Sequence, residues 1–217
     1  NYSAPVWGFH KGPDIERVHL KFLKQVLGVK QQTRNASVNG ELGRVPMHVI
    51  RKIRIIKFWY NVHKMPGSLQ YYILYMRDEN GNLVNEWTKK LYSIINDLGF
   101  SYLTNIDVIT NLQLQQLIRC VYDQYIQEWF ADIRNSPKLR SYNLFKSNFE
   151  LEKYLQVVTN TKHRIFLTRF RCSAHKLFIE EGRYRNVPLD QRICTKCNMN
   201  VIENEYHFLL ICPHYRD

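Results

Sequence analysis

Three cysteines and one histidine near the end of the chain are the feature that most restricts how it can fold. Two residues separate Cys194 from Cys197, nine separate Cys197 from His207, and four separate His207 from Cys212. Three thiolates and one imidazole complete the tetrahedral shell that zinc prefers, so the four side chains have to meet at one ion. The pattern predicts a structural Zn²⁺ site with these four ligands, in a zinc knuckle formed by residues 191–217.

Other uses of these residues fit the sequence less well. A redox Cys-x-x-Cys pair is expected near a βαβ pattern, and no such pattern surrounds Cys194. A catalytic zinc ion needs an open coordination position, which four protein ligands do not leave. His214 is an alternative ligand to His207 or Cys212, and the spacing does not decide between them.

Apolar residues recur at intervals of three and four through most of the chain, which is the spacing of one helix face. Ile15, Val18, Phe22 and Val26 share such a face, and Gly28 follows them as a stop signal. The sequence therefore predicts an all-α protein, with helices at 15–27, 46–64, 69–76, 83–98, 112–133, 149–158 and 162–181. We expect three consecutive parts: a helical region over 1–134, a basic helical region over 135–190, and the knuckle over 191–217.

Basic residues are in clear excess. The chain has 31 Lys and Arg against 19 Asp and Glu, a formal net charge of +12, which favours a polyanionic partner such as RNA or DNA. No apolar run approaches the roughly 18 residues of a membrane-spanning helix, so we expect no membrane partner. Cys120 and Cys172 lie outside the metal pattern and are typical of buried thiols in a reducing compartment.

The basic residues concentrate in two places. The helix predicted at 46–64 carries Arg51, Arg54 and Lys57, with Arg44 before it and no acidic residue between them. Such a row suits a phosphate backbone, although it is equally typical of a solvated helix face. The second group lies between residue 162 and the metal pattern, and its members could also extend from the core; it comprises Arg164, Arg169, Arg171, Lys176, Arg183, Arg185 and Arg192.

No arrangement of residues in the chain indicates catalysis. The paired acidic residues, such as Glu180 and Glu181, stand in polar surroundings, and the histidines are scattered. A glycine-rich phosphate loop and a nucleophile elbow are both absent. We therefore expect neither a catalytic centre nor a small-molecule substrate in this chain.

Several segments together resemble the C-terminal part of the reverse transcriptase of non-LTR (LINE-type) retrotransposons. The resemblance is densest at the two ends of the chain and thin between about 65 and 160. It is carried by residues 6–8, 15–24, 27–29, 35–36, 40–46, 54–59, 169–171, 181–183, and Cys194 through Cys212 and Pro213.

The resemblance implies a region that follows the palm, around the thumb, and ends at the cysteine–histidine motif. The palm's Tyr/Phe-x-Asp-Asp pattern is missing here, since Phe130-Ala-Asp132 lacks the second aspartate. The region would bind element RNA and target DNA during target-primed reverse transcription, beside the remainder of the reverse transcriptase chain. Such a protein would work in a nuclear or cytoplasmic ribonucleoprotein. The alternative is a zinc-stabilised helical scaffold that binds a protein partner.

Overall fold

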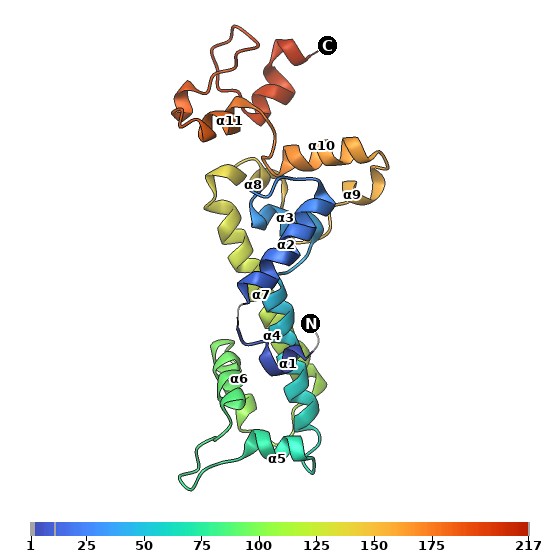
Figure 1. Ribbon diagram of the computed structural model, residues 1–217, viewed down its shortest axis with the longest axis vertical. Coiled ribbons are helices and arrows are strands. Elements are labelled where there is room, and N and C mark those ends of the chain that lie inside the picture. Colours follow the sequence, from blue (N-terminus) through green and yellow to red (C-terminus); the bar gives the residue numbers. More distant parts are fainter. Residues whose placement is uncertain (1–2, 11, 217) are drawn as a thin grey trace. The chain divides into compact units, whose positions relative to one another are not determined.

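The computed structural model describes residues 3–10 and 12–216. The regular structure of these residues is helical, and the only β-pairing among them consists of three isolated bridges. Figure 1 shows the helices in sequence colours. The prediction of an all-α protein is confirmed. No helix in the described part of the chain is both long and apolar enough to cross a bilayer.

The chain divides into two compact units that are not consecutive in sequence. Unit 1 comprises Asn1–Val18 and Val45–Glu128, and unit 2 comprises His19–Arg44 and Trp129–Asp217. The division falls inside two helices, α2 (Pro13–Leu27) and α7 (Asn111–Arg134). It differs from the three consecutive parts expected from the sequence, because residues 19–44 group with the C-terminal part.

Unit 1 is a helical cluster around the long helix α4. Its other complete helices are short, and side-chain caps mark where two of them begin: Ser68 accepts from the Tyr71 N–H, and Asn85 from those of Trp87 and Thr88. The core is apolar, with Trp59 buried and its indole N–H donating to the Tyr75 hydroxyl at 2.8 Å. The elements are α1 (Ala4–Trp7), α4 (Met47–His63), α5 (Leu69–Tyr75), α6 (Glu86–Asp97) and η1 (Ser101–Thr104).

Unit 2 packs its N-terminal segment against the end of α7 and the residues that follow it. Gly40 lies so close to Trp129 and Tyr142 that an added Cβ would stand 2.5 Å from the indole ring and 2.5 Å from the tyrosine hydroxyl. The Trp129 indole N–H also donates to the Ala36 carbonyl at 2.7 Å. The helical elements are α3 (Asn35–Leu42), η2 (Pro137–Leu139), α8 (Tyr142–Phe145), α9 (Tyr154–Val157), α10 (Thr161–Arg171), α11 (Phe178–Tyr184), η3 (Leu189–Gln191), η4 (His207–Ile211) and η5 (Pro213–Tyr215).

The single helix predicted at 162–181 is wrong. Asn160 caps the start of α10, accepting from the N–H groups of Lys162 and His163, but the helix ends at Arg171. Ser173 then takes a left-handed backbone conformation with φ of 50°, which no helix continues through. The chain resumes as α11 at Phe178, so Arg164, Arg169 and Arg171 lie on α10, whereas Lys176 lies between the two helices.

Candidate metal centre and nucleic-acid interface

The four predicted metal ligands converge in the structure. The ligand atoms of Cys194, Cys197, His207 and Cys212 all lie within 4.8 Å of one another. Cys194, Cys212 and His207 are buried, and Cys197 is half-buried. Cys194 and Cys212 are 18 positions apart in sequence, yet all four residues form one cluster that could hold a metal ion.

A short hairpin positions the first two ligands. Ile193 pairs with Ile202 in an antiparallel bridge, and the Cys194 N–H donates to the Val201 carbonyl at 2.8 Å. Asn200 completes the reversal with a φ of 54°, a conformation that asparagine tolerates better than most residues. Inside this turn the Lys196 N–H points at the Cys194 sulfur, at 3.4 Å. The tight turn places both cysteine sulfurs on the same side.

A π-helical turn positions the other two ligands. In η4 the Cys212 N–H donates to the His207 carbonyl at 2.7 Å, an i→i+5 bond. An α-helix has about 3.6 residues per turn, so positions five apart would diverge. The wider π turn, which often occurs at functional sites, returns to the same side at the fifth residue. The Asn204 side chain starts this turn by accepting from the His207 N–H at 2.7 Å.

The cluster fits a tetrahedral metal ion. The Cys197 sulfur and the His207 Nε2 are 3.4 Å apart, close to the about 3.6 Å edge that Zn–S and Zn–N bond lengths give a tetrahedron. The Met199 N–H is the main cause that lowers the pKa of Cys197, whereas desolvation raises the pKa of Cys212. A bound cation would favour the thiolate at both positions. With four protein ligands, such a site has no open position for chemistry.

The structure also decides between the alternative ligands. His214 is exposed, and its ring packs against that of Tyr215 with centroids 4.8 Å apart. It does not belong to the cluster, whereas His207 and Cys212 do.

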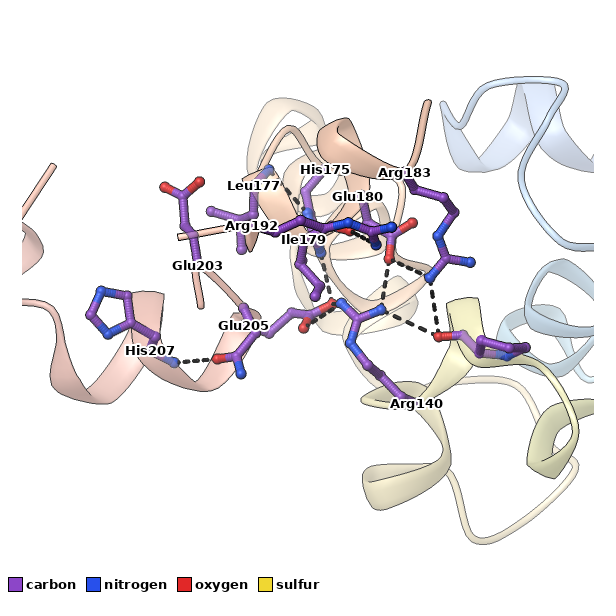
Figure 2. A network of polar contacts seen from close by, with 12 residues as sticks. Arg140, His175, Leu177, Ile179, Glu180, Arg183, Arg192, Glu203, Glu205 and His207 are labelled. Carbon is purple, nitrogen blue, oxygen red and sulfur yellow. Dashed lines mark hydrogen bonds and ion pairs between the residues drawn. The ribbon is translucent and has the colours of Figure 1, made fainter. Parts of the chain in front are cut away.

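A buried network of charges holds the metal-binding segment against α11 (Figure 2). Arg140 donates to Glu205 through two bonds of 2.8 and 2.9 Å, and to Glu180 at 2.7 Å. His175 makes a further contact of 2.9 Å with Glu205. Burial alone would raise the pKa of Glu205, but the His175 hydrogen bond and the charge of Arg140 outweigh it and hold the pKa at about 2.

Arg192 and Glu203 extend this attachment through the backbone. Arg192 donates to the carbonyls of Ile179 and Val187, both at 2.9 Å. The Glu203 carboxylate accepts from the Phe178 N–H at 2.6 Å, at the start of α11. Arg192 was predicted to contact nucleic acid, but its guanidinium is engaged in joining the hairpin to α11.

Two further residues predicted to contact nucleic acid have structural roles: Arg51 is buried, and Arg171 is half-buried. The Arg51 side chain has no exposed surface; it lies over the Trp7 ring and 3.9 Å from the Glu16 carboxylate. Arg171 makes two bonds of 2.9 Å to Glu41 and one of 2.8 Å to Glu152. Burial takes the Arg51 guanidinium group out of reach of a phosphate, which corrects that prediction, whereas the half-buried Arg171 guanidinium is engaged in internal ion pairs.

We expect Arg171→Gln to destabilise unit 2 by about 3–5 kcal/mol, because it leaves the fully buried Glu41 carboxylate without its cationic partner. Denaturant unfolding measures the change. Lys162→Gln, an exposed substitution on the same helix, is the matched control and should shift stability by less than about 0.5 kcal/mol. Equal stability of the two variants would show that Arg171 has no such structural role.

The remaining predicted contacts are at least partly exposed. Arg164 and Arg183 are half-buried and donate to the carbonyls of Val158 and Pro137, each at 3.3 Å. Arg185 is exposed and pairs with Glu181 at 2.7 Å. The side chains that reach the surface, in addition to Arg185, are Arg44, Arg54, Lys57, Arg169 and Lys176.

An aromatic groove beside the metal-binding segment was missed by the sequence reasoning. The groove has a volume of about 540 Å³ and lies among α10, α11 and residues 195–215. Phe166, on α10, is 64% exposed. The groove combines aromatic and basic side chains: Phe166, Phe170, Phe178, Phe208, Tyr215, Lys176, Arg185 and Lys196. The aromatic content of the sequence was the one signal available, and it did not say which rings are exposed.

No protein-family model, curated protein or solved structure matches this chain.

Proposed function

We propose that this chain is a nucleic-acid-binding region of a reverse transcriptase of the non-LTR retrotransposon class, and that it binds single-stranded RNA or DNA in the aromatic groove. The single observation that carries the binding proposal is the groove itself, where exposed rings and basic side chains share one surface. The assignment to reverse transcriptases relies on the resemblance of the sequence.

The groove has the two components that single-strand binding requires. Bases stack on aromatic rings, and a stacked base contributes roughly 1–3 kcal/mol to binding. Lys176 and Lys196 stand beside the rings, and neither makes an ion pair among the described residues. They supply charge for the backbone phosphates. Two carboxylates, Glu181 and Glu203, also line the groove, but Glu203 is turned to the Phe178 N–H and Glu181 is paired with Arg185.

Zinc is the metal we propose for the Cys₃His cluster, because thiolate and imidazole ligands in this number are typical of structural zinc. The ion would cross-link the hairpin to η4. The chain's own residues do the binding: η4 and η5 carry Phe208 and Tyr215 into the groove. The metal centre would therefore act on nucleic acid indirectly, by fixing one wall of the groove.

We expect the double variant Phe166→Ala/Lys176→Gln to bind a fluorescent single-stranded oligouridylate at least tenfold more weakly than the wild type. The loss reflects one stacking surface and one phosphate contact. Fluorescence anisotropy at 50 and 200 mM salt gives the affinity and its salt slope. The double variant should have a shallower slope.

The matched control is Phe22→Ala/Lys162→Gln, which removes another exposed ring, 61% exposed, and another exposed lysine of unit 2. It should bind like the wild type. Equal affinity of both double variants would exclude the groove as the nucleic-acid-binding site. Binding that does not change with salt would contradict a nucleic-acid partner and favour the alternative protein scaffold.

A further inference from the structure

A second cavity lies in unit 2, at the start of α3. It has a volume of about 530 Å³, within the range of roughly 300–1,000 Å³ that small-molecule sites occupy. Its lining is polar: it includes Lys24, Thr33, Arg34, Asp132 and Ser136. No residue of this cavity lines the aromatic groove.

The N-terminus of α3 opens onto this cavity without a cap. Asn35 and Ala36, its first two residues, line the cavity, and Arg34 before them makes no side-chain cap bond. The first turn contains no acidic residue. The N–H groups of a first helical turn lack intrahelical partners and carry partial positive charge, which suits an anion.

Two enclosed hydroxyl groups in the lining also lack partners. Thr33 is only 3% exposed, and its Oγ1 makes no hydrogen bond among the described residues. Ser136, also in the lining, is half-buried, and its Oγ makes no hydrogen bond among the described residues either. Buried hydroxyls are normally hydrogen-bonded, and a hydroxyl can donate to an anion. Both groups therefore indicate a ligand with acceptor oxygens.

Buried positive charge adds to this arrangement. Lys24 is 6% exposed and donates to the Gln31 carbonyl at 2.7 Å. Burial, and next the charge of Lys138, lower the pKa of Lys24. An anion in the cavity would stabilise the charged form of Lys24 and so oppose the effects of burial and of Lys138. Asp132 is the one carboxylate in the lining, and no ion pair with Lys24 or Arg34 is present in the described structure.

From these features we infer that the cavity binds a phosphate group, held by the first turn of α3, the hydroxyls of Thr33 and Ser136, and the charges of Lys24 and Arg34. The group could belong to inorganic phosphate, to a nucleoside monophosphate or to the 5′ end of an oligonucleotide. This inference does not depend on the proposed function, since the residues of the two sites are separate.

Titration of the full chain with inorganic phosphate at constant ionic strength, followed by ³¹P NMR and calorimetry, tests the inference. We expect saturable binding, and at least tenfold weaker binding by Thr33→Val/Ser136→Ala, which removes both donors with little change in volume. Asp132→Asn should bind several-fold more tightly, because it removes the opposing charge. Lys162→Gln should bind like the wild type.

The source of the phosphate is distinguished by parallel titrations with adenosine monophosphate, and with one oligonucleotide carrying either a 5′-phosphate or a 5′-hydroxyl. The source is the ligand with the strongest dependence on Thr33 and Ser136. The inference is overturned if the wild type shows no saturable phosphate binding, or if Asp132→Asn and Thr33→Val/Ser136→Ala both bind as it does. The groove variant Phe166→Ala/Lys176→Gln should retain phosphate binding, so the proposal for the groove and the proposal for the cavity are tested independently.

Discussion

Cys194→Ser is expected to abolish metal binding and to unfold the segment over residues 178–216. Apart from the ion pairs of Arg140 with Glu180 and Glu205, little regular structure holds the segment together: the seven residues of α11, a hairpin with one bridge, and a π turn of five residues. In zinc-finger peptides, structural zinc contributes about 10–16 kcal/mol of binding free energy that is coupled to folding. A loss of that size exceeds what the remaining contacts of a short segment supply.

Metal content by mass spectrometry and amide hydrogen exchange measure the two effects together. The amide protons of Cys194, Glu203 and Cys212, which donate to backbone carbonyls at 2.7–2.9 Å, should lose their protection. Cys120→Ser is the matched control, because Cys120 lies in unit 1 and outside the cluster. A Cys194→Ser protein that keeps its metal and its protected amides would refute the proposed metal site.

We also expect Arg140→Gln to destabilise unit 2 by about 3 kcal/mol or more. The substitution leaves Glu180 and Glu205, whose side chains are 1% and 6% exposed, without their shared cation. Removing one partner of a buried ion pair is costly, because the other charge stays desolvated. Chemical denaturation gives the change, with Arg185→Gln as the control: that residue forms an exposed pair with Glu181, and such pairs contribute about 0–1 kcal/mol.

The cost of Arg140→Gln should depend on pH in a defined direction. The pKa of Glu205 is held at about 2 in the folded protein, below its ordinary value of about 4.3. Its contribution to stability is therefore complete above about pH 5 and is lost as the pH falls toward 2. The stability difference between the wild type and the variant should narrow over that interval. A difference that stays constant between pH 5 and pH 3 would show that Glu205 is not stabilised by Arg140.

Much of the secondary structure could be predicted because its causes are local. The apolar spacing of α2 and α4, the Gly28 stop and the Asn160 cap all act within a few residues. The break at Ser173 could not be predicted in this way. Nothing in the adjacent sequence requires the left-handed conformation that separates α10 from α11.

The roles of the arginines could not be predicted, because they depend on carboxylates that are distant in sequence. Arg171 meets Glu41 across 130 positions, and Arg140 meets Glu205 across 65. Arg51 and Arg54 are three positions apart in sequence, yet Arg54 is exposed and Arg51 is fully buried. A count of basic residues measures the charge of the chain, but not which guanidinium groups face solvent.

The sequence by itself determined the all-α fold and the four residues of the metal cluster. Helix formation depends on neighbours along the chain, and metal ligation depends on residue types whose spacing restricts the geometry. Only the tertiary structure decided which basic side chains are internal, which aromatic rings line a groove, and where an uncapped helix meets two hydroxyls without partners. These properties arise from contacts between segments far apart in sequence, and each contact is set by the packing of the whole unit.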